Sequence, residues 1–402
     1  MLFRSQQLGK TPFLNKQKPT PYDEAVSLIW YLENVFYPAA GRIIHALKTQ
    51  FPHSVNKQHP VLQMGFWPGG DRDGNPFVTA ATTAQVADAL RGSIIKCYYL
   101  DVRRLKRRLT FKGVDQLLID LENQLYNNIF IPGHRTQLSK ADILHTLHNI
   151  RDILVYQHNS LFLHLVDSLI SRVEVFGLHF ASLDIRQDSS IHSQAVEVIG
   201  KKTGLLPDNY ADLSETEKVR LLSEATGDIG THIFEEGIVK DTLQTVKAVR
   251  VIQQFNGPEG CNRYIISQCK NALNVLEVFA LFGWCGWKKE ELDIDIVPLF
   301  ETIEDLRNAG DVMKVLYSNP IYRAHLRRRA DRQTIMLGFS DGTKDGGYLM
   351  AKRSRRKPTP SRERDDAQDP RTTGSRRMRP RSHPARPWPS CPVLTMLCSL
   401  AR

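Results

Sequence analysis

The sequence predicts a mostly α-helical α/β protein whose short strands run parallel, in an open sheet or an incomplete barrel surrounded by helices. Two observations carry this prediction. Four short apolar runs are bounded by polar or turn residues, which is typical of buried parallel strands. Longer segments with apolar residues at helical spacing separate these runs, so strand and helix alternate along the chain.

The predicted strands span residues 178–185, 263–268, 292–300 and 334–340. The predicted helices lie at about 80–108, 113–127, 139–174, 192–203, 214–226, 239–255, 270–283 and 302–317. A closed eight-stranded barrel needs twice as many strands. Either the chain contains further strands that the apolar pattern does not reveal, or the barrel is incomplete.

Another helix is predicted to begin near Thr20, which can cap it, with Pro21 at the first helical position. The segment 139–174 is apolar on one side and contains neither Gly nor Pro, which predicts one long helix. Three of its histidines, His148, His158 and His164, are assigned no role, because histidines on such a helix are more often edge or core residues than ligands.

The positive charge is concentrated at one end of the chain. The net charge is +11, but residues 352–402 carry 14 Lys and Arg against 4 Asp and Glu. The other 351 residues carry 40 against 39, so they offer no uniformly basic face and nucleic acid is an unlikely partner.

Residues 352–402 also hold 8 of the 21 prolines and show no helical or strand period. We expect this Arg/Pro-rich tail to be unstructured, because it cannot bury a core. An arginine-rich nucleic-acid arm is the alternative. The abrupt change after Ala351 also suits a shifted reading frame, so the predicted boundary divides residues 1–351 from 352–402.

Other signals point to a cytoplasmic protein without a membrane span. No stretch reaches the roughly 18 apolar residues of a transmembrane helix. The first 20 residues lack the apolar core of a secretory signal. The six cysteines show no CxxC spacing, which favours free thiols in a reducing compartment.

The candidate functional residues follow the predicted strands. Arg186 follows the first, Glu301 the third and Asp341 the fourth, with Lys344 one turn later. Functional groups of α/β barrels gather at these carboxyl ends. Two carboxylates suit Mg²⁺ or Mn²⁺, and the cations suit an anionic substrate. Singly, each residue could instead be a cap or half of an ion pair. Their shared position at strand ends strengthens the interpretation as a site but leaves both alternatives open.

The segment 64–79, MGFWPGGDRDGNPFVT, is the other conspicuous one. Asp71, Asp73 and Asn75 have the spacing of a calcium loop, but Pro76 and Thr82 occupy positions that need Gly and Glu. An EF-hand is therefore rejected. No Gly-Lys-Ser/Thr follows, so the segment is not a Walker loop either.

Four segments together resemble the phosphoenolpyruvate carboxylase family in order and spacing. They are GGDRDGNPFVT, LDIRQDS, VPLFETIEDL and LGFSDGTKDGGYLMA. KPTPYDEA and YIISQ occupy places where that family has similar segments. The resemblance covers residues 1–351 and implies a partial phosphoenolpyruvate-carboxylase-type barrel with a helical region.

The resemblance also implies an activity, in which phosphoenolpyruvate and bicarbonate give oxaloacetate and phosphate, feeding the tricarboxylic acid cycle. The family requires Mg²⁺ or Mn²⁺ and is homo-oligomeric. By resemblance, Glu301 and Asp341 are metal ligands and Lys344 is catalytic. Arg186 and Arg72 are substrate-binding residues.

Two family segments have no counterpart here. The chain contains neither the Thr-Ala-His-Pro-Thr-Glu segment with the catalytic histidine nor the Gly-Arg-Gly-Gly loop that follows KDGG. The family's C-terminal region, with its aspartate inhibitor site, is likewise unmatched. The alternative hypothesis is therefore a catalytically inactive, truncated fragment.

Overall fold

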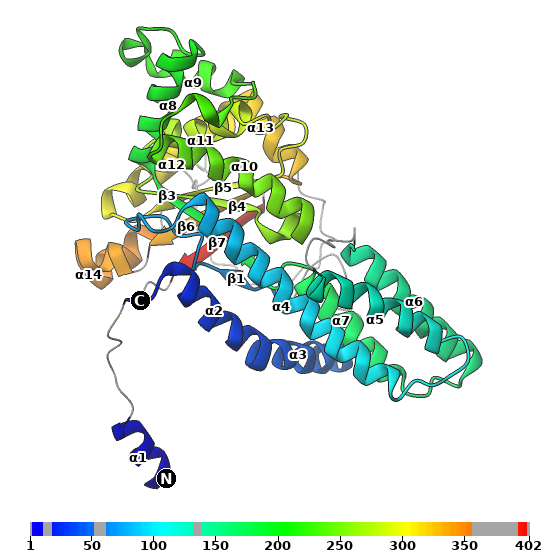
Figure 1. Cartoon of the computed structure of the whole chain (residues 1–402). Coiled ribbons are helices and arrows are strands. Elements are labelled where there is room, and N and C mark those ends of the chain that lie inside the picture. The colour runs from blue at the N-terminus through cyan, green and yellow to red at the C-terminus, as the bar shows by residue number, and fades with distance from the viewer. Residues whose placement is uncertain are drawn as a thin grey trace, which may run out of the picture. The chain divides into compact units, whose positions relative to one another are not determined.

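The computed structural model describes residues 2–10, 18–51, 62–131, 138–338 and 340–355 and the backbone of 393–399 (Figure 1). The chain forms two compact units. The first comprises Met1–Ile199 and Asp228–Tyr264, and the second comprises Gly200–Gly227 and Ile265–Arg402. We describe each unit by itself.

The first unit is mainly helical. Its helices are α1 (Leu2–Lys10), α2 (Pro21–Tyr31), α3 (Tyr37–Gln50), α4 (Ala80–Lys106), α5 (Asp115–Phe130), α6 (Lys140–Gln157), α7 (Leu163–Phe176), α8 (Ser189–Thr203, ending in the second unit) and α10 (Ile238–Asn256). A π-helical turn, η1 (Leu32–Phe36), joins α2 to α3. The strands are β1 (Gly65–Phe66), β2 (Ser182–Leu183) and β3 (Ile185–Asp188).

Helix α4 is the centre of this unit, because α2, α5, α7 and α10 all pack against it. Thr79 caps its first turn by accepting a hydrogen bond from the Thr82 amide. Tyr98 of α4 is completely buried and donates a hydrogen bond of 2.7 Å to the Gly177 carbonyl. Its ring lies beside that of Tyr37, so α3, α4 and the end of α7 share one aromatic core.

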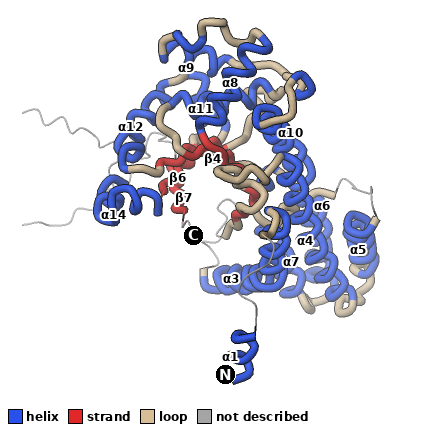
Figure 2. The backbone as a smooth tube through the Cα atoms, turned by 60° about the vertical axis from the view of Figure 1, so that its left-hand side comes forward, coloured by secondary structure: helices blue, strands red, loops and turns tan. Residues whose placement is uncertain are grey.

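The second unit is built on a sheet in which β4, β5, β6 and β7 follow one another in that order. Figure 2 labels β4, β6 and β7 of this sheet. The strands are β4 (Arg263–Ser267, beginning in the first unit), β5 (Asp295–Phe300), β6 (Arg332–Gly338) and β7 (Val393–Ser399). The helices are α9 (Glu215–Glu224), α11 (Ala272–Trp284), α12 (Ile303–Ser318), α13 (Pro320–Arg328) and α14 (Ser340–Arg355). Strand β6 pairs in parallel with both β5 and β7.

The mostly helical α/β class with parallel strands is confirmed, and a barrel stays a prediction. The single helix predicted at 139–174 is wrong, because α6 ends at Gln157 and α7 begins at Leu163. The backbone between them turns left-handed at Asn159, Ser160 and Phe162, which no α-helix can accommodate.

Other boundaries differ from the prediction. The first predicted strand, 178–185, is two short strands, β2 and β3, and Arg186 lies inside β3 instead of following it. The two-residue strand β1 and the helix α13 were not predicted from the sequence.

The predicted unstructured tail falls largely outside the described residues. Within it, the structure describes the end of α14 and the strand β7. The boundary at 351 stays a prediction. Among the described residues, none of the helices is both long and apolar enough for a membrane span.

Candidate active site

In the first unit, the segment GGDRDGN forms a tight loop directly after β1. β1 pairs in parallel with β2, with Gly65 opposite Ser182. The contact continues beyond β1, between the loop and β3. The Arg186 amide donates to the Gly70 carbonyl and the Arg72 amide donates to the Arg186 carbonyl, both at 2.9 Å. The loop and the LDIRQ segment are thus bound together through their backbones.

Two glycines allow this close approach. Gly69 has a φ of +81°, a conformation that favours glycine. A Cβ atom on Gly70 would overlap the backbone oxygen of Asp184. A larger residue at Gly70 would push the loop away from the strand, and one at Gly69 would collide with the Val86 side chain of α4.

Arg186 is held on three sides. Its Nη2 atom lies 2.6 Å from the Asp73 carboxylate, and its Nε atom lies 3.4 Å from that of Asp71. The guanidinium also lies over the Trp67 ring, 5.3 Å from its centre. Burial raises the pKa of Asp71, and the Arg186 charge offsets part of this effect. Arg186 is therefore a fixed cation at the loop.

Arg72 is the most deeply buried of the predicted site residues, with 5% of its surface exposed. Its guanidinium donates to the Asp241 carboxylate and to the Thr245 hydroxyl, both on α10. Asp241 also accepts a hydrogen bond of 2.9 Å from the amide of Ala80, at the start of α4. One carboxylate thus joins the loop, α4 and α10.

We expect Asp241→Asn to lower the free energy of unfolding by about 1–3 kcal/mol, because it leaves a buried guanidinium without its counterion. Urea unfolding measures this. The matched control is Asp228→Asn, since Asp228 pairs with Lys247 but its side chain is 72% exposed. Equal effects of the two substitutions would contradict the bridging role of Asp241.

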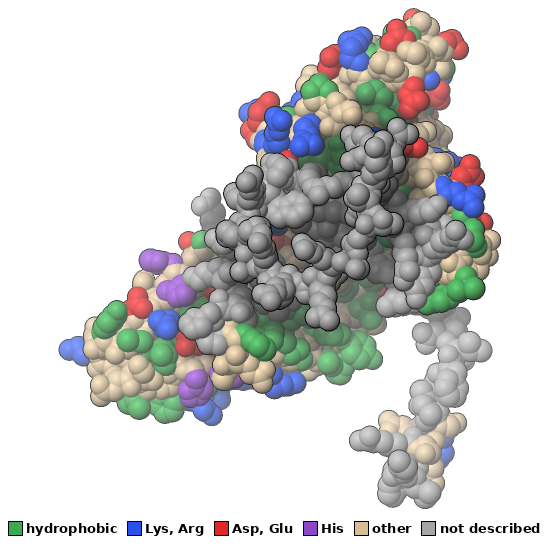
Figure 3. All heavy atoms as spheres, turned by 180° about the vertical axis from the view of Figure 1, so that it is seen from behind, with side chains coloured by type: hydrophobic (Ala, Val, Ile, Leu, Met, Phe, Trp, Pro, Cys, Tyr) green, Lys and Arg blue, Asp and Glu red, His purple; other side chains and the backbone are tan. Residues whose placement is uncertain are grey.

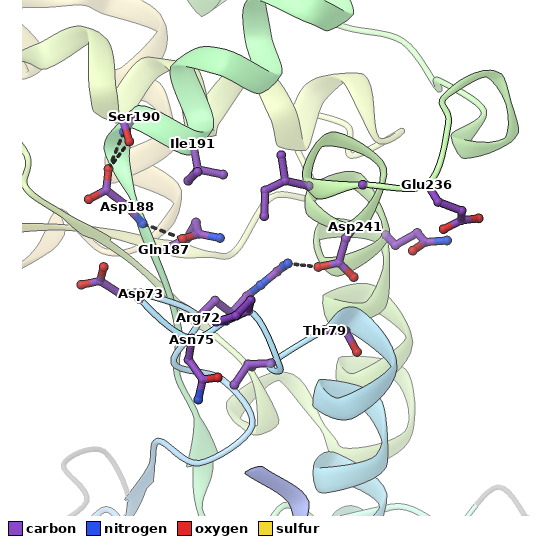
Figure 4. A pocket seen from close by; sticks show the side chains of 16 residues that line it. Arg72, Asp73, Asn75, Thr79, Gln187, Asp188, Ser190, Ile191, Glu236 and Asp241 are labelled. Atoms are coloured by element: carbon purple, nitrogen blue, oxygen red, sulfur yellow. Dashed lines mark hydrogen bonds and ion pairs between the residues drawn. The ribbon is translucent and has the colours of Figure 1, made fainter. Parts of the chain in front are cut away.

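A cavity of about 760 Å³ opens beside this loop (Figure 4). Its walls come from the loop, the end of β3 and the first turns of α8 and α10. Arg72 reaches across it to Asp241, and Asp188 at the far wall accepts hydrogen bonds from the Ser190 amide and hydroxyl. The cavity is large enough for a small anionic metabolite.

In the second unit, Glu301 and Asp341 follow neighbouring parallel strands. Phe300 of β5 is paired with Leu337 of β6, so Glu301 and Gly338 are the next residues along each strand. A Cβ atom on Gly338 would lie 3.1 Å from the Glu301 Cα atom. Glu301 therefore lies against the end of β6. This strand ends at Gly338, three residues before Asp341.

Carboxylates also fix the helices that begin at this edge. Asp305 accepts a hydrogen bond of 3.0 Å from the Thr302 amide and forms a capping box with it. Asp345 of α14 accepts one of 2.9 Å from the Ile303 amide. The start of α14 is thereby bound to the start of α12, which positions Asp341 near the end of β5.

Lys344 lies one turn after Asp341 on α14. Its Nζ atom is 3.4 Å from the Asp341 carboxylate, and its side chain is 74% exposed. The structure thus brings Glu301, Asp341 and Lys344 to one sheet edge in the second unit, and Arg72 and Arg186 to one loop in the first. That all five share one site stays a prediction.

The donor set at the sheet edge suits a hard cation. Within the described ranges, no group of three or more His, Cys, Asp or Glu is arranged to hold a metal. Mg²⁺ often binds proteins through only one or two carboxylates and takes its other ligands from water and substrate. Glu301 and Asp341 are ligands of this type, and their binding of one ion stays a prediction.

A sequence model described as phosphoenolpyruvate carboxylase matches residues 4–129 and 122–354 of this chain. The chain belongs to the phosphoenolpyruvate carboxylase family. It is 30% identical to the phosphoenolpyruvate carboxylase of Gloeobacter violaceus over 85% of its own length and 43% of the relative's. The corresponding protein of Synechococcus sp. is 29% identical, over 85% and 39%.

The Thermosynechococcus vestitus protein of the same name is 30% identical over 82% of this chain and 39% of the relative. The chain therefore spans about two fifths of the length of these curated relatives. The family predicted from the sequence is confirmed, and the roles of the predicted site residues stay predictions. The sequence offers no signal for Asp241 and Thr245, which hold Arg72.

Proposed function

We propose that this chain carries part of a phosphoenolpyruvate carboxylase active site, which converts phosphoenolpyruvate and bicarbonate to oxaloacetate and phosphate. The observation that supports the proposal best is the placement of Glu301, Asp341 and Lys344 at the ends of β5 and β6. The family match extends over all three positions. A cytoplasmic, homo-oligomeric enzyme of central carbon metabolism is part of the same proposal.

Glu301 and Asp341 would hold Mg²⁺ or Mn²⁺, which supplies positive charge to the oxygens of an anionic substrate. Lys344 adds a cation beside this pair, where negative charge develops during carboxylation. Arg186 offers a planar guanidinium for a phosphate or carboxylate, with its direction set by Asp73 and Trp67. Arg72 binds substrate only if its Asp241 contact rearranges; otherwise it supports the cavity wall.

A chimaera tests the proposal: residues 4–351 of this chain replace the matching part of the Gloeobacter violaceus relative. We expect it to form oxaloacetate, and Lys344→Ala to lower kcat by roughly 10²–10³-fold through loss of charge stabilisation. Lys314→Ala is the matched control. Lys314 forms the same i,i+3 pair with an aspartate, Asp311, and its side chain is 71% exposed.

A folded chimaera without activity would contradict the proposed function. A Lys344→Ala chimaera as active as the Lys314→Ala one would contradict the role of Lys344. Circular dichroism and unfolding curves establish whether each variant is folded.

A further inference from the structure

In the first unit, the connection from α4 to α5 meets the connection from α6 to α7 at one end of this group of helices (Figure 1). Phe111 of the first connection stacks on His158 of the second, with ring centres 4.7 Å apart. The Nε2 atom of His158 also lies 3.4 Å from the carbonyl oxygen of Lys112. The two connections therefore form one surface. We call residues 102–114 and 155–165 the basic tip.

The basic tip carries six Lys or Arg and no Asp or Glu, although residues 1–351 are almost neutral overall. Three of the six cations lie in the last turn of α4, where they suit the helix dipole and pair with Asp101 or Glu122. The helix accounts for these three. The other three follow the helix, are exposed, and form no ion pair with any residue that the structure describes. They are Arg107, Arg108 and Lys112.

Large apolar side chains lie exposed on the same surface. Tyr156 is 83% exposed, Leu161 52% and Phe162 43%. The Phe162 ring centre is 6.4 Å from that of Phe111, which precedes Lys112 in the chain. Figure 3 shows basic and hydrophobic side chains interspersed at the lower left, at this end of the first unit.

The backbone of the α6–α7 connection is strained where it carries these side chains. Phe162 has a φ of +60°, and Asn159 and Ser160 are also left-handed. A bulky residue rarely adopts this conformation, and such strain is concentrated at functional positions. The connection therefore holds Leu161 and Phe162 at the surface at a cost in free energy.

The composition of the basic tip indicates the chemistry of its partner. Cations without counterions attract a surface with many negative charges. Exposed aliphatic and aromatic side chains are stabilised when they enter a hydrocarbon boundary. A nucleic acid would instead require free aromatic faces for base stacking, but one face of Phe111 is covered by His158. An anionic lipid surface suits both kinds of side chain.

We propose that the basic tip binds the surface of an anionic lipid bilayer. Arg107, Arg108 and Lys112 contact the lipid phosphates, and Leu161 and Phe162 enter the boundary between headgroups and acyl chains. The binding is peripheral and weakens as salt screens the charges. The proposal is independent of the proposed carboxylation, because no residue of the basic tip belongs to the candidate active site.

An environment-sensitive dye attached to Tyr156→Cys tests the proposal in the whole chain. The background is Cys391→Ser with Cys398→Ser, since the four other cysteines are buried and free. Vesicles of phosphatidylcholine and phosphatidylserine in equal parts should shift the dye emission to shorter wavelength, and pure phosphatidylcholine vesicles should not. The same dye on Val251→Cys, on α10, is the positional control, because Val251 is also exposed. No shift at residue 156, or the same shift at both positions, would overturn the proposal.

Two triple variants measure the contribution of the cations. The tip variant combines Arg107→Gln, Arg108→Gln and Lys112→Gln. It should bind the phosphatidylserine vesicles at least about tenfold more weakly, because each cation near an anionic surface contributes roughly fivefold. The control variant makes the same charge change at three exposed cations outside the tip, and should bind within about twofold of the unsubstituted chain. It combines Arg42→Gln, Lys201→Gln and Arg307→Gln.

Equal weakening by the two triple variants would overturn the proposal, because the basic tip would then contribute only net charge. A single-stranded oligonucleotide that shifts the dye at residue 156 and binds more tightly than the vesicles would also overturn it, because the partner would then be a nucleic acid.

Discussion

The isolated 402-residue chain should form oxaloacetate from phosphoenolpyruvate and bicarbonate at less than about one hundredth of the rate of a full-length relative. It contains no His-Pro-Thr-Glu segment and no Gly-Arg-Gly-Gly segment. Loss of a positioned proton-transfer group typically costs 10²–10⁴-fold in rate, and loss of one charge-stabilising contact roughly 10²–10³-fold. These factors need not multiply, because groups in one site act together. A coupled assay for oxaloacetate measures the rate.

Metal binding distinguishes an incomplete site from a misfolded one. Mn²⁺ titration of the same chain should show one site, and Asp341→Asn should weaken it at least about tenfold through loss of a charged ligand. The matched control is Asp311→Asn, since the Asp311 side chain on α12 is 82% exposed and pairs with Lys314 as Asp341 pairs with Lys344. Turnover close to that of the full-length relative would show that the absent segments are dispensable.

The helices were predictable because their apolar spacing and their caps are local properties. α4, α10 and α12 begin within one residue of their predicted starts, at Ala80, Ile238 and Ile303. Thr79 and Thr302 mark two of these starts by capping them. Helix α13 was missed because its nine residues are too short for a clear period, although Asn319 caps it and Pro320 opens it.

The site was partly predictable for a physical reason. The carboxyl ends of neighbouring parallel strands meet at one edge of a sheet, so Glu301 and Asp341 could be paired from the sequence. The partner of Arg72 could not be predicted, since Asp241 lies 169 positions later in the sequence, on α10. Likewise, the ion pair between Arg186 and Asp73 depends on the way β1 and β2 bring two distant segments together.

Three buried histidines make stability depend strongly on pH. Burial lowers the pKa of His179 to about 4 and those of His192 and His325 to about 3, below the ordinary value of 6.5. The charge of Arg72 lowers that of His192 further. All three are therefore neutral in the folded protein at pH 7. In the unfolded chain they become protonated as the pH falls below about 6.5.

The unfolded state then binds more protons than the folded state, so acid favours unfolding. Stability from these groups is fully present above about pH 6.5 and declines as the pH falls to about 4 for His179 and about 3 for His192 and His325. We expect each histidine to lower the free energy of unfolding by about 1.4 kcal/mol per pH unit between about pH 5.5 and 4.5. Denaturant unfolding at a series of pH values measures this slope.

His325→Phe should reduce this slope by the contribution of one histidine, about 1.4 kcal/mol per pH unit. The His325 ring lies between Phe279 and Tyr322, with ring centres 5.6 Å from each, so a phenyl ring suits the site. His164→Phe on α7 is the matched control, because His164 is exposed. If the His325→Phe slope equals that of the unsubstituted chain, His325 is protonated in the folded state and its burial does not destabilise the protein in acid.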